Sequence, residues 1–312
     1  MKGLIVVPYV ADTQWIAEIA DGHSLAELPI AGKSLSEYCV ESAVKRGFEM
    51  CEILDWRYSK KLSQQFSDLT AGQLPIFYHN FAGPQLRGLI DLVRLSTPLT
   101  QNIEEDLTVV WGMSLPSNPL GDGNLEPLDV GECANTPSGV YRRFEGRWMR
   151  VQHRQILIRS PREWLDANIA ALHSPEEWTL PGYSAEKDVH LGRNVVLEHG
   201  ANVKPPVLLQ DNSWCERNVT LDGDVIVGYG SVIGEGAKLK NTVVCDDTYI
   251  GTGLELVDKI VIGRRIIDAD TGAYTDIEEP GLARGISGGF GWLKKIVAFL
   301  HGKSRRRAEY NG

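Results

Sequence analysis

Residues 189–248 repeat a six-residue pattern of apolar and polar positions without a gap. Each hexad begins with Val, Ala or Ser, and each has an aliphatic residue or cysteine at its third position. The hexads are VHLGRN, VVLEHG, ANVKPP, VLLQDN, SWCERN, VTLDGD, VIVGYG, SVIGEG, AKLKNT and VVCDDT. Because short strands joined by turns bury alternate side chains, this period predicts stacked coils around one apolar column.

The repeat resembles that of the left-handed parallel β-helix, in which three hexads make one triangular coil and residues 18 apart stack. Stacking at that spacing predicts one column of Val189, Val207, Val225 and Val243, and another of Leu197, Cys215 and Ile233. After Asp247 the register moves by one residue, and Leu254/Leu256 and Ile260/Ile262 continue it.

The cysteines of the repeat, Cys215 and Cys245, both occupy the third position of a hexad but fall on different columns. We therefore expect both to be core residues that do not pair with each other.

Residues 1–175 show a different pattern, in which short apolar runs alternate with segments of helical spacing. The runs GLIVV, CEILDW and DLTVVWG predict strands, and SLSEYCVESAVKRGF and GPQLRGLIDLVRLS predict helices. Such alternation predicts an α/β layer with a mostly parallel sheet.

Composition narrows the functional classes. The chain has 312 residues, enough for two domains, and a net charge of −9 argues against a nucleic-acid binder. The opening MKGLIVV is interpreted as a strand rather than a signal peptide, and no apolar run approaches the roughly 20 residues of a membrane span. Five scattered cysteines without a CxxC pair suit a reducing cytoplasm.

Several motifs of the first half, in their order, resemble those of the sugar-1-phosphate nucleotidyltransferases. LPIAGKSLSEYCVESAVKRGF resembles the family's LPVAGKPLIEY segment, DLTVVWGMSL lies where the family has a strand ending in Gly-Asp, and RSPREWLDANIAAL resembles its GTPEDYLEANRALL helix. The resemblance extends to about residue 265. It implies a nucleotidyltransferase domain followed by a left-handed β-helix.

The phosphate-binding loop departs from this family. The family has GxGTRLxPLT…PK after its first strand, whereas residues 8–32 here read PYVADTQWIAEIADGHSLAELPIAG, with four acids and no Lys or Arg. Leu25 stands at the family's signature lysine, and of the basic positions Lys33 remains. Repulsion between like charges about 4 Å apart is on the order of 4 kcal/mol near a protein surface, so this loop disfavours a nucleoside triphosphate.

The metal positions and the GTAG turn depart as well. The family holds Mg²⁺ with two carboxylates, and Met113 and Leu157 occupy the matching positions. Neither side chain offers the oxygen that a hard cation requires. The turn reads QLRG and keeps Gly88. The positions that the resemblance leaves as residual nucleotide or sugar site are Gly32, Lys33, Gly88 and Gly112, with no catalytic residue and no metal ligand assigned.

Three further groups are candidates for binding or catalysis. Arg142, Arg143, Arg147 and Arg150 lie on a hairpin predicted to turn at Glu145-Gly146, and they form a candidate anion site or a solvated surface. His190 and His199 would be the bases of a hexapeptide-repeat acyltransferase, or ordinary turn residues. Asp12, Asp21 and His23 match no metal-ligand spacing and are interpreted as loop residues.

The tail GGFGWLKKIVAFLHGKSRRR predicts a short basic amphipathic helix behind a glycine-rich hinge at 281–291. Trp292, Ile296, Phe299 and Leu300 form one apolar stripe, and Lys294, Lys295 and the following basic residues supply positive charge. Such a helix suits an anionic membrane surface, or docking on this protein or a partner subunit. Both alternatives stay open.

We therefore expect an α/β fold with a Rossmann-like nucleotidyltransferase domain (1–178), a left-handed parallel β-helix of hexapeptide repeats (179–268), and a linker with the basic helix (269–312). The departures from the family pattern indicate a degenerate, non-catalytic member, and the resemblance implies a scaffold or regulatory subunit for surface polysaccharide or envelope glycan assembly. The alternatives are an active sugar-1-phosphate nucleotidyltransferase and a hexapeptide-repeat acyltransferase. We expect no cofactor (Mg²⁺ only for the active alternative), a protein partner of a glycan-assembly complex, homo-oligomers, no nucleic acid, and a cytoplasmic or inner-face peripheral location.

Overall fold

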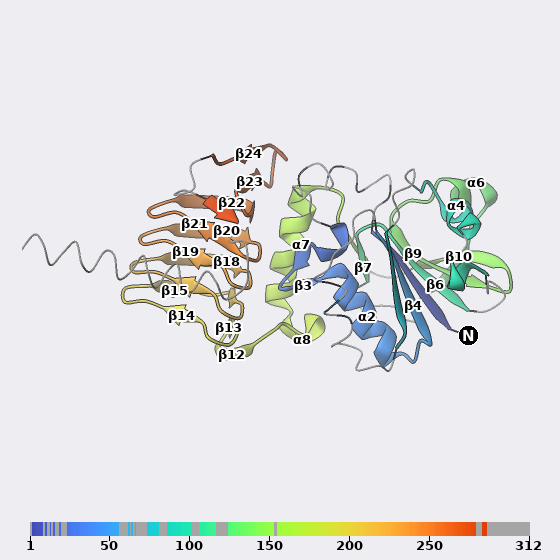
Figure 1. Ribbon diagram of the computed structural model, residues 1–312, viewed down its shortest axis with the longest axis horizontal. Coiled ribbons are helices and arrows are strands. Elements are labelled where there is room, and N and C mark those ends of the chain that lie inside the picture. Colours follow the sequence, from blue (N-terminus) through green and yellow to red (C-terminus); the bar gives the residue numbers. More distant parts are fainter. Residues whose placement is uncertain are drawn as a thin grey trace, which may run out of the picture.

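The computed structural model describes residues 2–8, 10, 13, 15, 19, 24–55, 62, 64, 66, 74–80, 86–95, 97–101, 106–116, 124–152, 155–278 and 283–285. Figure 1 shows an α/β part, coloured blue to green, beside a stack of short strands coloured yellow to orange. Helix α7 (Pro161–His173) stands between the two parts. In the described ranges, no helix is long and apolar enough to cross a membrane.

The α/β part is built on a seven-stranded sheet in the order β5-β4-β1-β6-β9-β10-β8. Strands β5, β4, β1 and β6 are parallel, and β9, β10 and β8 extend the sheet with antiparallel pairs. The sheet is therefore parallel on one side only, because β9 runs antiparallel to β6. β9 and β10 form the predicted hairpin, which turns at Glu145-Gly146 with positive φ at both residues. The strands of this part are β1 Gly3–Val7, β2 Pro29–Ile30, β3 Lys33–Ser34, β4 Met50–Asp55, β5 Ile76–Asn80, β6 Leu107–Trp111, β7 Ser114–Pro116, β8 Asn124–Pro127, β9 Gly139–Phe144, β10 Arg147–Gln152 and β11 Gln155–Leu157.

Local sequence explains where the helices begin. Ser34 caps α2 in a capping box with Glu37, and Asp129 does the same for α6 with Glu132. The helix predicted over 83–96 is shorter than expected, because α4 begins only after Gly88. Leu89 N–H donates to Thr136 Oγ1, so its hydrogen bond goes to another segment and not to a preceding helical turn. Apart from α7, the helices of this part are η2 Leu25–Glu27, α2 Leu35–Lys45, α4 Leu89–Arg94, α5 Pro98–Gln101, α6 Val130–Ala134 and α8 Pro175–Trp178.

The second part consists of strands that stack in parallel from β13 to β22, with antiparallel pairs at its ends, namely β12 on β13, β23 on β22, β24 on β23 and β25 on β21. A nine-stranded sheet has the order β12-β13-β16-β18-β20-β22-β23-β24 with β15 paired to β18, and a five-stranded sheet has the order β14-β17-β19-β21-β25. The bounds are β12 Tyr183–Glu186, β13 Val189–Leu191, β14 Val196–Leu197, β15 Asn202–Lys204, β16 Val207–Leu209, β17 Trp214–Cys215, β18 Thr220–Val227, β19 Val232–Ile233, β20 Lys238–Val244, β21 Thr248–Ile250, β22 Glu255–Ile262, β23 Arg265–Asp268, β24 Tyr274–Asp276 and β25 Ala283–Gly285.

The predicted columns are confirmed except at one residue. Val189 pairs with Val207 and Val207 with Val225, and the column Leu197–Cys215–Ile233 is also formed. Val225, however, pairs with Thr242 rather than with Val243. The register slips earlier than predicted because the turn that holds Gly223 and Asp224 in one coil is a single residue, Asn241, in the next.

This earlier slip moves Cys245 out of the interior of the stack. Val244 belongs to the interior cluster, whereas Cys245 is buried in the cluster shared with the α/β part. Cys215 lies in the interior, as predicted. Both cysteines are core residues, and none of the five cysteines forms a disulfide.

Helix α7 joins the two parts through one continuous hydrophobic core. Its buried Trp164, Leu165 and Leu172 belong to the same cluster as Leu208 and Ile226 of the stack. Asn168, fully buried on the same helix, accepts from Ala31 N–H (2.7 Å) and donates to Trp164 O (2.8 Å). The two parts are thus packed against a common helix rather than joined by a solvated linker.

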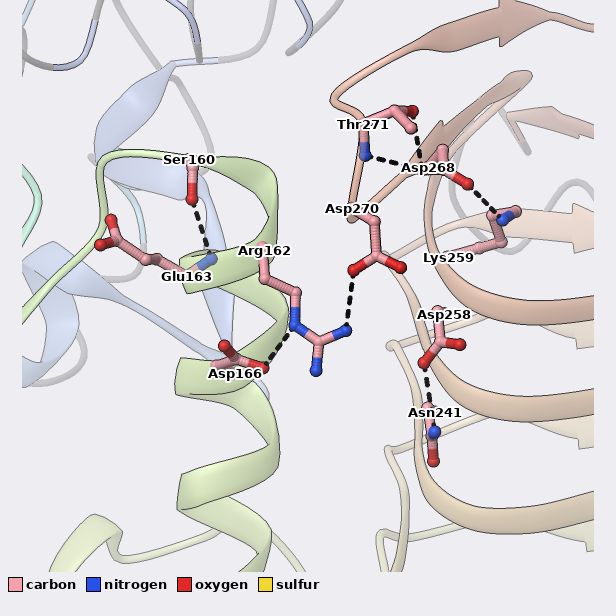
Figure 2. A network of polar contacts seen from close by, with 10 residues as sticks. All are labelled: Ser160, Arg162, Glu163, Asp166, Asn241, Asp258, Lys259, Asp268, Asp270 and Thr271. Atoms are coloured by element: carbon pink, nitrogen blue, oxygen red, sulfur yellow. Dashed lines mark hydrogen bonds and ion pairs between the residues drawn. The ribbon is translucent and has the colours of Figure 1, made fainter.

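Polar contacts rim this junction on the exposed side (Figure 2). Arg162 of α7 binds Asp166 on its own helix (2.9 Å) and Asp270 of the stack (3.1 Å). Beside it, Asp268 accepts from Lys259 (2.7 Å) and from Thr271. Because the Arg162, Asp166 and Asp270 side chains are 44%, 52% and 65% exposed, their ion pairs add little stability, and the apolar contacts hold the junction.

We expect Asn168→Ala to lower the free energy of unfolding by about 1–3 kcal/mol, because Ala31 N–H would be left buried without an acceptor. Ala170→Ser, at an exposed position of the same helix, is the control and should cost less than about 0.5 kcal/mol. Urea unfolding followed by circular dichroism measures both. Equal midpoints for the two variants would contradict the role given to Asn168.

Burial raises the pKa of Cys39 and of Cys215 to about 12, and that of Cys51 well above its ordinary value. Because the thiolate is the reactive form, these thiols should stay unmodified by a disulfide reagent at neutral pH until the chain is unfolded. Tyr183→Cys, at a position that is 59% exposed, provides a rapidly reacting reference thiol. Fast labelling of Cys215 in the folded wild type would show that the stack opens readily.

Candidate functional site

The order of the parallel strands defines where a ligand site is expected. From β1 the chain passes through α2 to β4 on one side, whereas β6 lies on the other side of β1. Ligands of open α/β sheets bind outside the carboxyl ends of the strands at such a switch point. The candidate site is therefore the edge formed by residues that follow β1 and β6, together with the ends of β4 and β5.

The gap between β1 and β6 is closed by tight backbone packing. Gly112 N–H donates to Val7 O (2.8 Å), and Gly112 has a φ of +73°. A Cβ at Gly112 would clash with Ser138 and approach Val10 Cγ2 to 3.1 Å. Gly112 thus serves the close approach of two chain segments.

The turn after β1 uses its own polar groups internally. Val10 N–H donates to Thr13 Oγ1 (2.9 Å), and the Thr13 hydroxyl donates to Pro8 O (2.9 Å). Thr13 is fully buried. In a phosphate-binding loop the backbone N–H groups point at the ligand. Here the N–H of Val10 is already bonded.

The two positions that the resemblance assigned to metal carboxylates meet in space. Ile158 N–H donates to Met113 O (3.0 Å), and Leu157 pairs with Ser114 in the two-stranded sheet of β7 and β11. Met113 is fully buried in the core, and Leu157 is partly buried. The described residues contain no group of three or more His, Cys, Asp or Glu placed to hold a metal ion.

Gly32 and Lys33 lie at the junction with the stack instead of at this edge. Gly32 lies at the tip of the hairpin β2–β3, and Lys33 begins β3. Helix α7 holds this hairpin through Trp164 Nε1 donating to Pro29 O (2.9 Å) and through Asn168. Gly32 has a φ of +90°, and a Cβ there would lie 2.6 Å from Nε2 of Gln210. The LPIAGK segment is therefore packed between α7 and the first coils of the stack.

Lys33 is neutralised within its own neighbourhood. Its Nζ lies 2.8 Å and 3.0 Å from the two carboxylate oxygens of Glu41, and 5.6 Å from the centre of the Tyr38 ring. Burial, and then the charges of Glu41 and Glu37, raise the pKa of Tyr38, so that its hydroxyl stays protonated. The one basic position kept from the phosphate-binding pattern thus has a protein carboxylate as its counter-ion.

Gly88 packs against α6. A Cβ on Gly88 would clash with the backbone carbonyl of Cys133 and lie 2.7 Å from that of Ala134. The preceding residues lie close to the turn after β1, because Leu86 forms an isolated bridge with Val10. Gly88 and Gly112 are thus near the same edge, and Gly32 and Lys33 are at the junction, so the four predicted positions fall into two groups.

A buried polar cluster at the end of β4 was not found from the sequence. Asp55, 1% exposed, accepts from the Ser24 hydroxyl and from the Tyr78 hydroxyl (2.8 Å). The sequence feature that points to this cluster is the acid near the end of the predicted strand CEILDW, Asp55 before Trp56. Its oxygens serve at least two protein hydroxyls, and this clamps the segment before η2 to the sheet edge.

The hairpin arginines are spread over both faces of the sheet. Arg142 binds Asp106 (2.7 Å) on one face, and Arg150 binds Glu132 (3.1 Å) on the other. Arg143 lies over Trp148, with its guanidinium 5.7 Å from the ring centre, and burial lowers its pKa. Arg147 is exposed at the turn. These four side chains do not converge on one point, and their role as an anion site stays a prediction.

The remaining candidates are either separate or not described. His190 lies in β13, and His199 is exposed in the turn after β14. Outside the described residues lie Asp12, Asp21, His23 and the tail stripe of Trp292, Lys294, Lys295, Ile296, Phe299 and Leu300.

Comparison with known proteins gives two distant relatives. Over 132 residues the chain is 31% identical to a UTP–glucose-1-phosphate uridylyltransferase from Synechocystis sp., a match that covers 42% of this chain and 31% of that protein. Over 292 residues it is 23% identical to the bifunctional protein GlmU from Burkholderia vietnamiensis, covering 90% of this chain and 59% of that protein. No family model matches. The chain thus spans less than two thirds of each relative, and it is distantly similar to the sugar-1-phosphate nucleotidyltransferases, the group to which its motifs pointed.

Proposed function

We propose that this protein is a non-catalytic member of the sugar-1-phosphate nucleotidyltransferases, with the stack as a left-handed β-helix. In this proposal it acts as a scaffold or regulatory subunit of surface polysaccharide or envelope glycan assembly, at the cytoplasmic face of a membrane. The sugar pathway rests on the resemblance and the two distant relatives.

The observation that carries the proposal is that Met113 and Leu157 lie on neighbouring segments. Ile158 N–H donates to Met113 O, and Leu157 of β11 pairs with Ser114 of β7. The two segments are adjacent, as a shared metal site requires, yet Met113 is a fully buried core side chain. Mg²⁺ binds through oxygen ligands at near-octahedral geometry. Phosphoryl transfer depends on the metal to neutralise developing charge, so a thioether and an isobutyl group at these positions favour a non-catalytic protein.

The charge around the hairpin supports the same proposal. Lys33 is ion-paired with Glu41, and the segment 8–32 has acids without a Lys or Arg. To use Lys33, a nucleoside triphosphate would have to displace Glu41 and approach an acidic segment. Both steps oppose binding of a polyanion.

The scaffold role draws on the continuous core at α7. A protein that serves as a platform has to hold its surfaces in a fixed arrangement, and α7 packs on the hairpin and on β18, β20 and β22 at once. The same packing explains why LPIAGK is retained without its phosphate-binding partner sequence: Ala31 and Pro29 are bonded to α7.

We expect no pyrophosphate release above that of heat-denatured protein when the full chain is incubated with each nucleoside triphosphate, Mg²⁺ and sugar-1-phosphates. The physical reason is that Met113 and Leu157 occupy the two positions where the family has its metal-binding carboxylates. A coupled pyrophosphate assay measures this, with an active nucleotidyltransferase run in parallel. Turnover that disappears in Lys33→Ala would overturn the proposal.

We expect Met113→Asp to lower the free energy of unfolding by about 3 kcal/mol or more, because an unpaired carboxylate would be buried in the core. The volume-conserving Met113→Leu should cost less than about 1.5 kcal/mol. Urea unfolding of the double variant Met113→Asp/Leu157→Asp is measured without Mg²⁺ and again in millimolar Mg²⁺. A midpoint restored by Mg²⁺ would mean that these positions still form a metal site.

A further inference from the structure

The coils of the stack present three outer faces, which the strand register separates. Leu208, Ile226, Val243 and Ile260 stack in register and belong to the core cluster around α7. A second row, with Lys204, Asp222, Lys240 and Val257 in register, is mostly charged. The third face belongs to the five-stranded sheet.

This third face is apolar and aromatic. In the five-stranded sheet Leu197, Cys215, Ile233 and Ile250 form one row, and the last three belong to the interior cluster. Successive side chains of a strand point to opposite sides, so the preceding row points outward. We call this row, Val196–Trp214–Val232–Tyr249, the aromatic face.

The aromatic face differs from an ordinary solvated sheet. Val196 is 42% exposed, Trp214 and Tyr249 are partly buried, and Val232 is 2% exposed between them. A solvated face normally alternates apolar-in with polar-out along each strand. Here both rows of the sheet are apolar, which is typical of a face that packs against another element.

We propose that the tail of this chain, residues 292–300, docks on the aromatic face as an amphipathic helix. The last described strand, β25, pairs with β21 at the edge of the same sheet, and 27 residues follow Gly285 in the sequence. The stripe Trp292, Ile296, Phe299 and Leu300 supplies one apolar side. This proposal does not rest on the scaffold role proposed above, and it gives the tail a binding surface other than the membrane.

The dimensions of the two surfaces match. Four neighbouring strands from β21 to β14 span about 14 Å at the usual strand separation. A helix over residues 292–300 is about 13 Å long. Residues 286–291 would connect it to β25, and six residues reach at most about 20 Å, enough to place the helix anywhere along the aromatic face.

The charges are also complementary. The turns that flank β14, β17, β19 and β21 carry more acids than bases, namely Glu198, Asp211, Glu216, Glu235, Asp246 and Asp247 against Arg193 and Arg217. The tail carries six Lys or Arg between residues 294 and 307 and no acid. β25 runs antiparallel to β21 with Gly285 opposite Thr248, so β25 ends at the end of β21 that follows Asp246 and Asp247. Opposite charges on the rims thus favour the tail over an acidic partner.

Hydroxyl-radical footprinting of the full-length protein tests the proposal through Trp214 and Tyr249. Phe299→Asp places a charge on the apolar stripe, and Ala298→Asp places the same charge on the opposite side of the helix as the matched control. We expect Phe299→Asp to raise oxidation of both reporter side chains about threefold or more, because release of a mostly docked segment exposes them. Tyr183 and Tyr274, 59% and 48% exposed, are internal references whose oxidation should not change.

Circular dichroism of each variant should match that of the wild type, and Ile296→Asp provides a second disruption of the stripe. Equal footprints for the Phe299→Asp, Ile296→Asp and Ala298→Asp proteins would overturn the proposal. Protection that is lost on serial dilution would assign the aromatic face to a second copy of the chain. Footprints of Trp214 and Tyr249 that do not depend on the tail, together with wild-type binding to phosphatidylserine vesicles that Phe299→Asp abolishes, would assign the tail to a lipid surface. Either of these two results also overturns docking within one chain.

Discussion

The packing of α7 is the constraint on which the rest of the molecule depends. One helix buries Trp164, Leu165 and Leu172 in a cluster that includes side chains of both the α/β part and the stack. Apolar burial of this kind is worth roughly 1.5–3 kcal/mol for each large side chain, whereas the exposed ion pairs of Arg162 contribute little. The relative position of the two parts is therefore set by shape and apolar area, with the polar rim of Figure 2 as a minor term.

This packing has a direct consequence for the candidate site. The hairpin that carries Gly32 and Lys33 is bonded to α7 through Pro29 and Ala31 and is covered by Gln210. Its polar groups are thereby used to hold the junction. At the sheet edge the polar groups are also bonded within the protein. Thr13 Oγ1 accepts from Val10 N–H, and Asp55 accepts from the hydroxyls of Ser24 and Tyr78. Polar groups in both places have protein partners, which suits a structural role better than a role in binding a triphosphate.

The stack has two apolar faces, and these differ in the charged residues around them. The row Leu208–Ile226–Val243–Ile260 is covered by α7, which supplies apolar side chains. The aromatic face is bordered by acids, and the matching basic apolar stripe occurs in the tail of the same chain. A repetitive stack makes such surfaces easily, because a single residue type repeated once per coil becomes a continuous row.

The sequence by itself determined the strands β1, β4 and β6, the hairpin at Glu145-Gly146 and most of the columns of the stack. These features follow from local periodicity and turn chemistry, which act over a few residues. It also predicted that Met113 and Leu157 would stand at one site, through a resemblance. The tertiary structure alone decided the register at Thr242, the late start of α4 after Gly88 and the separation of Gly32 from Gly112. Each of these depends on segments that meet in the fold. The register at Thr242 depends on a turn that is one residue shorter than the turn of the preceding coil. The start of α4 depends on Thr136 beside Leu89, and the position of Gly32 depends on Gln210 against the hairpin. No local pattern encodes such contacts, because their free energy arises only when the two segments are brought together.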